Sequence, residues 1–291
     1  MNKTLWRWIA QSESWQTSVD LHIPTEEQST YHFLPRYDDF YLSLMRNCIN
    51  ILDSTNLSIN NEEVLLIAKG LEIFSLKGKQ NNFQHIDRRN NMLFAAGLYY
   101  LAGYSSSSII LSSLYKDYDI PIDEFISNFL QKSFKSQNEF SQYLWHYLET
   151  GNNEILEILL KKIDELNEES YNTNIDIYIS SLLAKRIINN LKNDNIWIDL
   201  LNIMDDKEFW KPYVLRCIKN EPAIINFFPS QREALKCGIL SEKTMSLQMP
   251  TSAGKTYLSE IVIYNQIKIL PESKVLYLTP YRALASELKK R

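Results

Sequence analysis

The chain has 291 residues, of which 45% are apolar, 23% charged and 12% aromatic. This composition can fill a sizeable core and excludes a disordered chain, and seven Gly, nine Pro and three Cys exclude collagen-like and disulfide-stapled proteins. The net charge of −4 is uneven, because residues 221–291 carry ten Lys and Arg against six acidic residues, whereas residues 1–220 carry 21 against 29. The acidic N-terminal region is therefore a poor general binder of nucleic acid.

The cysteines and the apolar segments bear on the location of the protein. Cys48, Cys217 and Cys237 lie far apart and form no metal-binding pair, so reduced thiols are expected. No stretch approaches the apolar length of a membrane-spanning helix, and residues 1–16 lack the apolar run of a signal peptide. The sequence therefore predicts a cytoplasmic protein that has no membrane partner.

The first 220 residues are predicted to be helical. No proline occurs between Pro35 and Pro121 or between Pro121 and Pro212, and such long runs favour helices. Apolar residues recur at three- and four-residue spacings, and this pattern predicts helices over residues 61–77, 89–101, 107–115, 140–148, 153–166 and 175–191, with another starting at Pro121. The isoleucine content of residues 175–191 leaves a strand possible there. The acidic run over residues 164–169 is interpreted as a solvated helix end rather than a metal site.

The pattern changes between residues 218 and 226. From there the sequence predicts a helix over 231–237, a short strand over 244–249, a helix over 255–269, a strand over 274–278 and a helix that begins at Tyr281. Two strands joined through a helix form a βαβ unit, which implies a parallel sheet. The prediction is therefore an acidic all-helical domain over residues 1–220, followed by the start of an α/β domain over residues 221–291.

The segment MPTSAGKT, residues 249–256, lies between the first of these strands and the following helix. That context suits a phosphate-binding loop, in which backbone N–H groups and the helix N-terminus bind phosphate oxygens. Gly254 would let the backbone approach without a Cβ atom, and Lys255 would place a positive charge on the phosphates. The hydroxyl of Thr256 would be a ligand for Mg²⁺. Met249 stands where the general pattern has its first glycine.

Two further segments accompany this loop: FFPSQREA at residues 227–234 and YLTPYRALASE at residues 277–287. Together the three segments resemble the opening of a superfamily 2 helicase of the DEAD/DEAH type, and most of all the Ski-like group. The order and spacing fit, with 24 residues from Gln231 to Lys255 and 25 from Lys255 to Pro280. The resemblance covers about the last 70 residues, and it implies that they begin a RecA-like domain that is truncated at Arg291.

The resemblance assigns roles to particular side chains. Gln231 would hydrogen-bond the adenine edge and so select ATP, and Phe228 would pack beside the base. The phosphates of ATP, with Mg²⁺ held through Thr256, would be bound by Thr251, Ser252, Ala253, Gly254, Lys255 and Thr256. The backbone of a bound DNA or RNA strand would be contacted by Thr279, Pro280 and Arg282.

The catalytic part of such a motor is not found in these residues. A helicase of this type needs an Asp-Glu pair on a later strand and a second RecA-like domain. No strand followed by Asp-Glu occurs after residue 256. We therefore expect the chain to be the N-terminal part of a longer helicase, with no catalytic residue of its own and no ATPase activity alone.

Three functions remain open at this point. The first is the front part of an ATP-dependent helicase or translocase, whose acidic helical region regulates the motor or docks a protein partner. It resembles helicase subunits of bacterial antiphage defence systems, Hachiman-type systems among them, in which a nuclease subunit docks on the motor. The alternative is a helical protein-interaction module with a vestigial, inactive phosphate-binding loop. A third, another class of P-loop NTPase, is disfavoured by the segments around Gln231 and Arg282.

Overall fold

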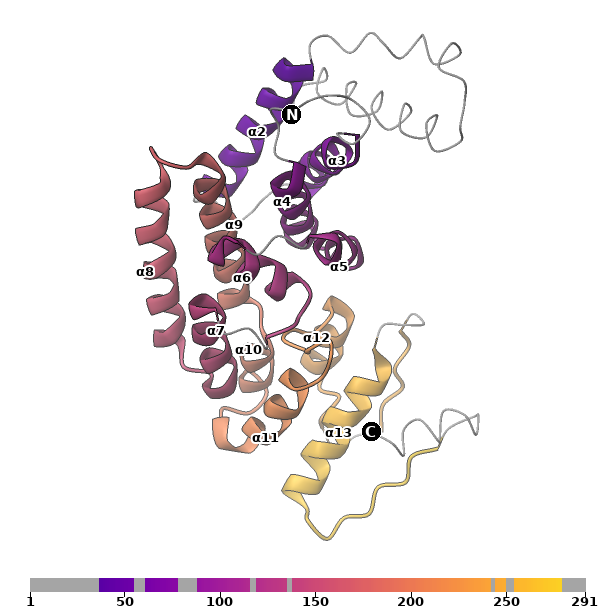
Figure 1. The fold of residues 1–291 in the computed structure, drawn as a ribbon. Helices are drawn as coiled ribbons and strands as arrows, with labels where there is room; N and C mark the ends of the chain where they lie inside the picture. The colour runs from indigo at the N-terminus through magenta and orange to yellow at the C-terminus, as the bar shows by residue number, and fades with distance from the viewer. Residues whose placement is uncertain are drawn as a thin grey trace, which may run out of the picture. The chain divides into compact units, whose positions relative to one another are not determined.

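The computed structural model describes residues 37–54, 61–77, 88–115, 119–134, 138–241, 244–249 and 254–278, which form helices and irregular segments (Figure 1). These residues divide into two compact units. The N-terminal unit comprises the described residues up to Asn195 together with Leu215–Ile225. The C-terminal unit comprises Ile196–Val214 and the described residues from Asn226 onward.

The N-terminal unit is helical, as the apolar spacing predicts. Its helices are α2 (Tyr37–Asp53), α3 (Asn61–Lys77), α4 (Arg88–Leu101), α5 (Ser105–Leu114), α6 (Pro121–Leu130), α7 (Glu139–Thr150), α8 (Asn153–Ser170) and α9 (Ile175–Asn193). Each predicted helix is confirmed to within a few residues at its ends. The segment that left a strand possible, residues 175–191, lies within α9.

Local side chains explain where several of these helices begin and end. Asn138, Asn152 and Asn174 precede α7, α8 and α9, and each side chain accepts a hydrogen bond from the backbone N–H two residues on, at 3.0 Å. Such caps satisfy N–H groups that have no partner within the helix. Gly151 ends α7 in the left-handed conformation, with φ of 61°. One glycine and one asparagine therefore separate two helices that would otherwise run together.

Helix α9 is the centre of the N-terminal core. It packs on α8 and also contacts α2, α4 and α6, and α8 and α9 lie side by side (Figure 1). Leu183 and Ile187 of α9 are completely buried. A Cβ atom added to Gly97 of α4 would lie 2.5 Å from Cδ2 of Leu183. Gly97 therefore allows the close approach of α4 and α9.

A buried carboxylate joins three parts of this core. Asp123 lies in the first turn of α6 and has no exposed surface. Its two oxygens accept hydrogen bonds from the Tyr115 hydroxyl at 3.0 Å and from the Ser180 hydroxyl of α9 at 2.5 Å. A helix N-terminus also favours negative charge. Asp123 thus links α6 to α9 and to the residue that follows α5.

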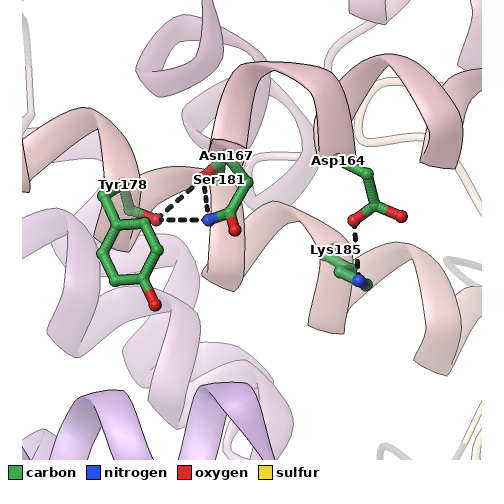
Figure 2. A network of polar contacts seen from close by, with 5 residues as sticks. All are labelled: Asp164, Asn167, Tyr178, Ser181 and Lys185. Carbon is green, nitrogen blue, oxygen red and sulfur yellow. Dashed lines mark hydrogen bonds and ion pairs between the residues drawn. The ribbon is translucent and has the colours of Figure 1, made fainter. Parts of the chain in front are cut away.

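Polar contacts join α8 to α9, as Figure 2 shows. The Asn167 side chain donates to the backbone oxygen of Tyr178 at 3.2 Å and to the Ser181 hydroxyl at 2.7 Å, and Lys185 pairs with Asp164 at 2.6 Å (Figure 2). The acidic run 164–169 forms the last turns of α8. In the described residues no group of three or more His, Cys, Asp and Glu side chains is placed to hold a metal ion.

All three cysteines lie within the described residues. Cys48 and Cys217 are buried and Cys237 is exposed, and none of the three forms a disulfide. Burial raises the pKa of Cys48 to about 12. None of the described helices combines the length and the apolar character that crossing a membrane requires.

The C-terminal unit contains α10 (Ile196–Leu201), the first part of α11 (Lys207–Ile218), α12 (Pro229–Lys236) and α13 (Lys255–Ile269). Aromatic rings of α11 surround Tyr264 of α13. The Tyr264 and Trp210 rings stack with centroids 5.8 Å apart, and the Tyr264 hydroxyl donates to the Phe209 backbone oxygen at 2.5 Å. Ile196–Val214 thus belongs with α13, and the division into residues 1–220 and 221–291 stays a prediction.

The two predicted strands are not found. Residues 244–249 and 274–278 are described, and neither is a strand. A strand exists only when a neighbouring strand supplies backbone partners, and alternating side chains alone cannot provide them. Leu276 and Leu278 are 82% and 81% exposed. The start of a RecA-like sheet therefore remains a prediction, and the helix expected from Tyr281 lies outside the described residues.

Candidate nucleotide-binding site

The starts of α12 and α13 carry the described part of the predicted nucleotide site. Pro229 occupies the first position of α12, where its fixed φ suits a helix and its missing N–H costs nothing. Phe228 precedes it in an extended conformation. Gly254 precedes α13, whose first residue is Lys255. Two short sequence signals thus fix the two helix starts.

The Gln231 side chain joins these two helix starts. Its Oε1 accepts from the backbone N–H of Phe228 at 2.8 Å, and its Nε2 donates to the backbone oxygen of Gly254 at 3.0 Å. The residue is 3% exposed. The structure therefore brings together two predicted site residues that are 23 positions apart, and it does so through a direct hydrogen bond.

Gly254 is required at its position for two reasons. Its φ of 74° and ψ of 33° are left-handed, which disfavours residues with a Cβ atom. A Cβ atom there would also lie 2.2 Å from Nε2 of Gln231. The sequence predicts that this glycine admits a phosphate. In the structure, the missing Cβ atom of Gly254 also leaves room for the Gln231 amide.

The first turn of α13 has the chemistry of an anion site. The first N–H groups of a helix have no partner within it and are polarised positively. The first turn of α13 contains no acidic residue that would compete with an anion. Lys255 has an exposed side chain, and Thr256 is half-buried. Both residues therefore fit the binding of phosphate and of a Mg²⁺ ion bound to it.

Phe228 and Gln231 differ in how accessible they are to a base. Phe228 is 50% exposed, which suits packing beside a planar ring. Gln231 directs one lone pair and one N–H at the protein backbone. An amide has two of each, so one lone pair and one N–H remain. Its reading of adenine stays a prediction, and its described role is to hold the two helix starts together.

An ion pair that sequence reasoning missed holds α12 against α10. Nε of Arg232 lies 3.0 Å from Oδ2 of Asp199, with the two side chains 22% and 13% exposed. Burial raises the pKa of Asp199 to about 6, and the charge of Lys236 and the N–H of Phe227 oppose that rise. One feature of the sequence marks Asp199: it is the single acidic residue within the apolar segment of residues 196–201.

The remaining predicted site residues lie outside the described residues. Among them are Thr251, Ser252 and Ala253 of the loop, and also Thr279, Pro280 and Arg282 of the nucleic-acid segment. Their roles stay predictions. The described site consists of Phe228, Gln231, Gly254, Lys255 and Thr256.

Comparison with known proteins tests the resemblance that the motifs indicate. Residues 228–291 match the DEAD/DEAH box helicase family. The chain is 48% identical over 75 residues to the ATP-dependent DNA helicase Hel308 of Thermococcus kodakarensis, covering 25% of this chain and 6% of that protein. It is 41% identical over 71 residues to Hel308 of Pyrococcus abyssi, covering 24% and 10%.

A third relative matches far more of the chain. The Hachiman protein HamB of Bacillus cereus is 22% identical over 261 residues, which cover 79% of this chain and 23% of HamB. That similarity extends well into the residues before α12. The chain spans less than a quarter of the length of each of these relatives. The resemblance to superfamily 2 helicases is confirmed, and the family match lies in residues 228–291.

Proposed function

We propose that this chain forms the front part of an ATP-dependent helicase or translocase that moves on DNA or RNA. The observation that carries the proposal is the contact of Gln231 with Gly254. It joins the first helicase motif to the phosphate-binding loop at the start of α13. The family match over residues 228–291 supports the same reading.

In this proposal ATP binds across the starts of α12 and α13. The phosphates lie against the N–H groups of the first turn of α13 and the Lys255 ammonium, and the Thr256 hydroxyl holds Mg²⁺. Phe228 packs beside the base, and the remaining polar atoms of Gln231 face the adenine edge. ATP supplies the free energy for movement along a strand. Thr279, Pro280 and Arg282 would contact the phosphates of that strand.

Hydrolysis needs groups that residues 1–291 do not provide in the expected place. The sequence contains no Asp after Asp206, so no Asp-Glu pair follows the phosphate-binding loop. We therefore propose that these residues bind ATP but do not hydrolyse it by themselves. A turnover rate for the 291 residues that disappears in Lys255→Ala would contradict this part of the proposal.

The similarity to HamB supports a proposal about the biological system in which the protein acts. It covers 79% of the chain and so includes much of the acidic helical region. We propose that the protein serves a Hachiman-type antiphage defence system. The N-terminal unit would regulate the motor or dock a protein partner such as a nuclease subunit, and the protein would act in the cytoplasm.

One alternative retains support. The chain could be a helical protein-interaction module whose phosphate-binding loop is vestigial. The separate core of the N-terminal unit favours it. Nucleotide binding separates the two functions, because a vestigial loop would not distinguish ATP from GTP.

The experiment measures the affinities of the chain for ATP and GTP with Mg²⁺ by calorimetry. We expect tighter binding of ATP and no measurable binding after Lys255→Ala. Gln231→Ala should weaken the binding of both nucleotides, because the hydrogen bond to Gly254 is lost. It should also lower the preference for ATP over GTP about tenfold, as expected for the loss of a base contact. The control Gln266→Ala, on the later turns of α13, should change neither. Equal affinity for ATP and GTP in the unmodified chain would refute the helicase reading.

A further inference from the structure

The N-terminal unit contains a cavity of about 460 Å³. It lies between the end of α6, the first half of α7 and the segment that follows α11. This volume is within the range of small-molecule sites. The residues that line it include Lys132, Phe134, Ser141, Trp145, Ile218 and Lys219.

Lys132 occupies a backbone position that favours glycine. It has φ of 54° and follows the C-cap of α6. Its N–H donates to the Phe129 oxygen at 3.0 Å, and the next N–H donates to the Asn128 oxygen at 2.9 Å. This pair of bonds is the Schellman motif, whose left-handed residue is usually glycine. A lysine is less stable than a glycine in this left-handed conformation. The backbone therefore does not explain why a lysine occurs at position 132.

Two polar groups of residues that line the cavity have no partner among the residues that the structure describes. The Lys132 side chain is half-buried, and burial lowers its pKa. No ion pair or hydrogen bond joins its ammonium group to another described residue. Ser141 is 1% exposed, and its buried hydroxyl has no hydrogen-bond partner among the residues that the structure describes. Buried polar groups of this kind are costly unless a ligand or water satisfies them.

The rest of the wall is apolar with a basic rim. Phe134 and Ile218 are buried and Trp145 is half-buried. Lys219 also lines the cavity, is exposed and adds a second cation, against one acidic residue among the lining residues, Glu221. The lining thus combines an aromatic side chain, two lysines and a serine, and this set matches a molecule with a planar apolar body and one anionic end.

We propose that this cavity binds a small organic anion, with an aromatic body against Trp145 and a phosphate or carboxylate held by Lys132 and Ser141. The site lies wholly within the N-terminal unit and does not use the phosphate-binding loop. The proposal therefore stands independently of the proposed helicase function. It gives the acidic helical region a ligand of its own.

The test uses fluorine NMR of the 291-residue chain labelled with 5-fluorotryptophan, in a Lys255→Ala background that disables the phosphate-binding loop. The Trp145→Phe spectrum assigns the Trp145 resonance. Phenyl phosphate and phenylacetate probe the two anionic ends, and benzyl alcohol is the neutral comparison. We expect both anions to shift the Trp145 resonance saturably, and benzyl alcohol to bind at least tenfold more weakly.

The decisive variant is Lys132→Gly. It should raise the thermal midpoint of the chain, because glycine relieves the left-handed backbone, and it should weaken phenyl phosphate binding at least tenfold. Ser141→Ala should weaken binding less. Lys161→Met, which removes an exposed lysine of α8, should leave binding unchanged. Unchanged affinity in Lys132→Gly, or equal affinity for benzyl alcohol and phenyl phosphate, would overturn the proposal.

Discussion

Replacing Arg232 with Met should destabilise the C-terminal unit strongly at pH 8 and little at pH 5. In the wild-type chain Nε of Arg232 lies 3.0 Å from the Asp199 carboxylate, and both side chains are largely buried. Without Arg232 the carboxylate is buried without this cation at pH 8. At pH 5 it can take up a proton instead, because burial raises its pKa to about 6 even in the wild-type chain.

The direction of this pH dependence follows from proton linkage. Asp199 has a folded pKa above its unfolded value of about 4, so between these values the folded state binds more protons. Its contribution to stability is therefore present at low pH and falls as pH rises through about 6. Removing one partner of a fully buried ion pair costs about 3–5 kcal/mol. Because both side chains retain some exposure, we expect about 2 kcal/mol at pH 8 and less than about 1 kcal/mol at pH 5.

The assay follows urea unfolding at both pH values by fluorine NMR of 5-fluorotryptophan, using the resonance of Trp197. That side chain is 2% exposed and lies on α10, two residues before Asp199. In an Asp199→Asn background, Arg232→Met should cost little at either pH, because no charge is left to compensate. A penalty of equal size at pH 5 and pH 8, or one that persists beside Asn at position 199, would refute the reasoning.

Two glycine substitutions test close approaches. Gly254→Ala should abolish ATP binding measured by calorimetry, because the new Cβ atom meets Nε2 of Gln231 at 2.2 Å and the backbone is left-handed. In a Gln231→Ala background its cost in urea unfolding should fall to about 1 kcal/mol for the backbone alone, and an undiminished cost would contradict the contact. Gly97→Ala should destabilise the N-terminal unit by about 1–3 kcal/mol in urea unfolding, through overlap with Leu183. If this penalty does not shrink in a Leu183→Ala background, the proposed overlap is wrong.

The helices were predictable because their signals are local. Apolar spacing, the proline at the start of α6 and glycine or asparagine at helix ends act within a few residues. The predicted bounds of residues 61–77 and 255–269 agree with α3 and α13. The strands failed for the opposite reason. Their side-chain pattern is local, but the backbone partners that make a strand are not.

The sequence predicts the site only as a set of residues, without most of the contacts among them. The motifs indicated Gln231 and Gly254 as residues of one nucleotide site, and the described hydrogen bond joins them. The ion pair of Asp199 with Arg232 could not be found from the sequence, because its members lie 33 positions apart in segments that carry no shared pattern. Lys132 was equally hidden, since no local rule places a lysine in a left-handed conformation.

The contact between Gln231 and Gly254 also bears on what the helicase motif is for. An amide that reads adenine must be held in one orientation, and the backbone groups of Phe228 and Gly254 hold it so. The same contact fixes the glycine that precedes α13. Base recognition and phosphate binding would then both depend on the Gln231 side chain. A ligand that displaced its amide would break the hydrogen bond to Gly254. Loss of Gln231 should therefore lower the affinity for every nucleotide and the preference for ATP by separate factors, and separate measurements on ATP and GTP resolve the two.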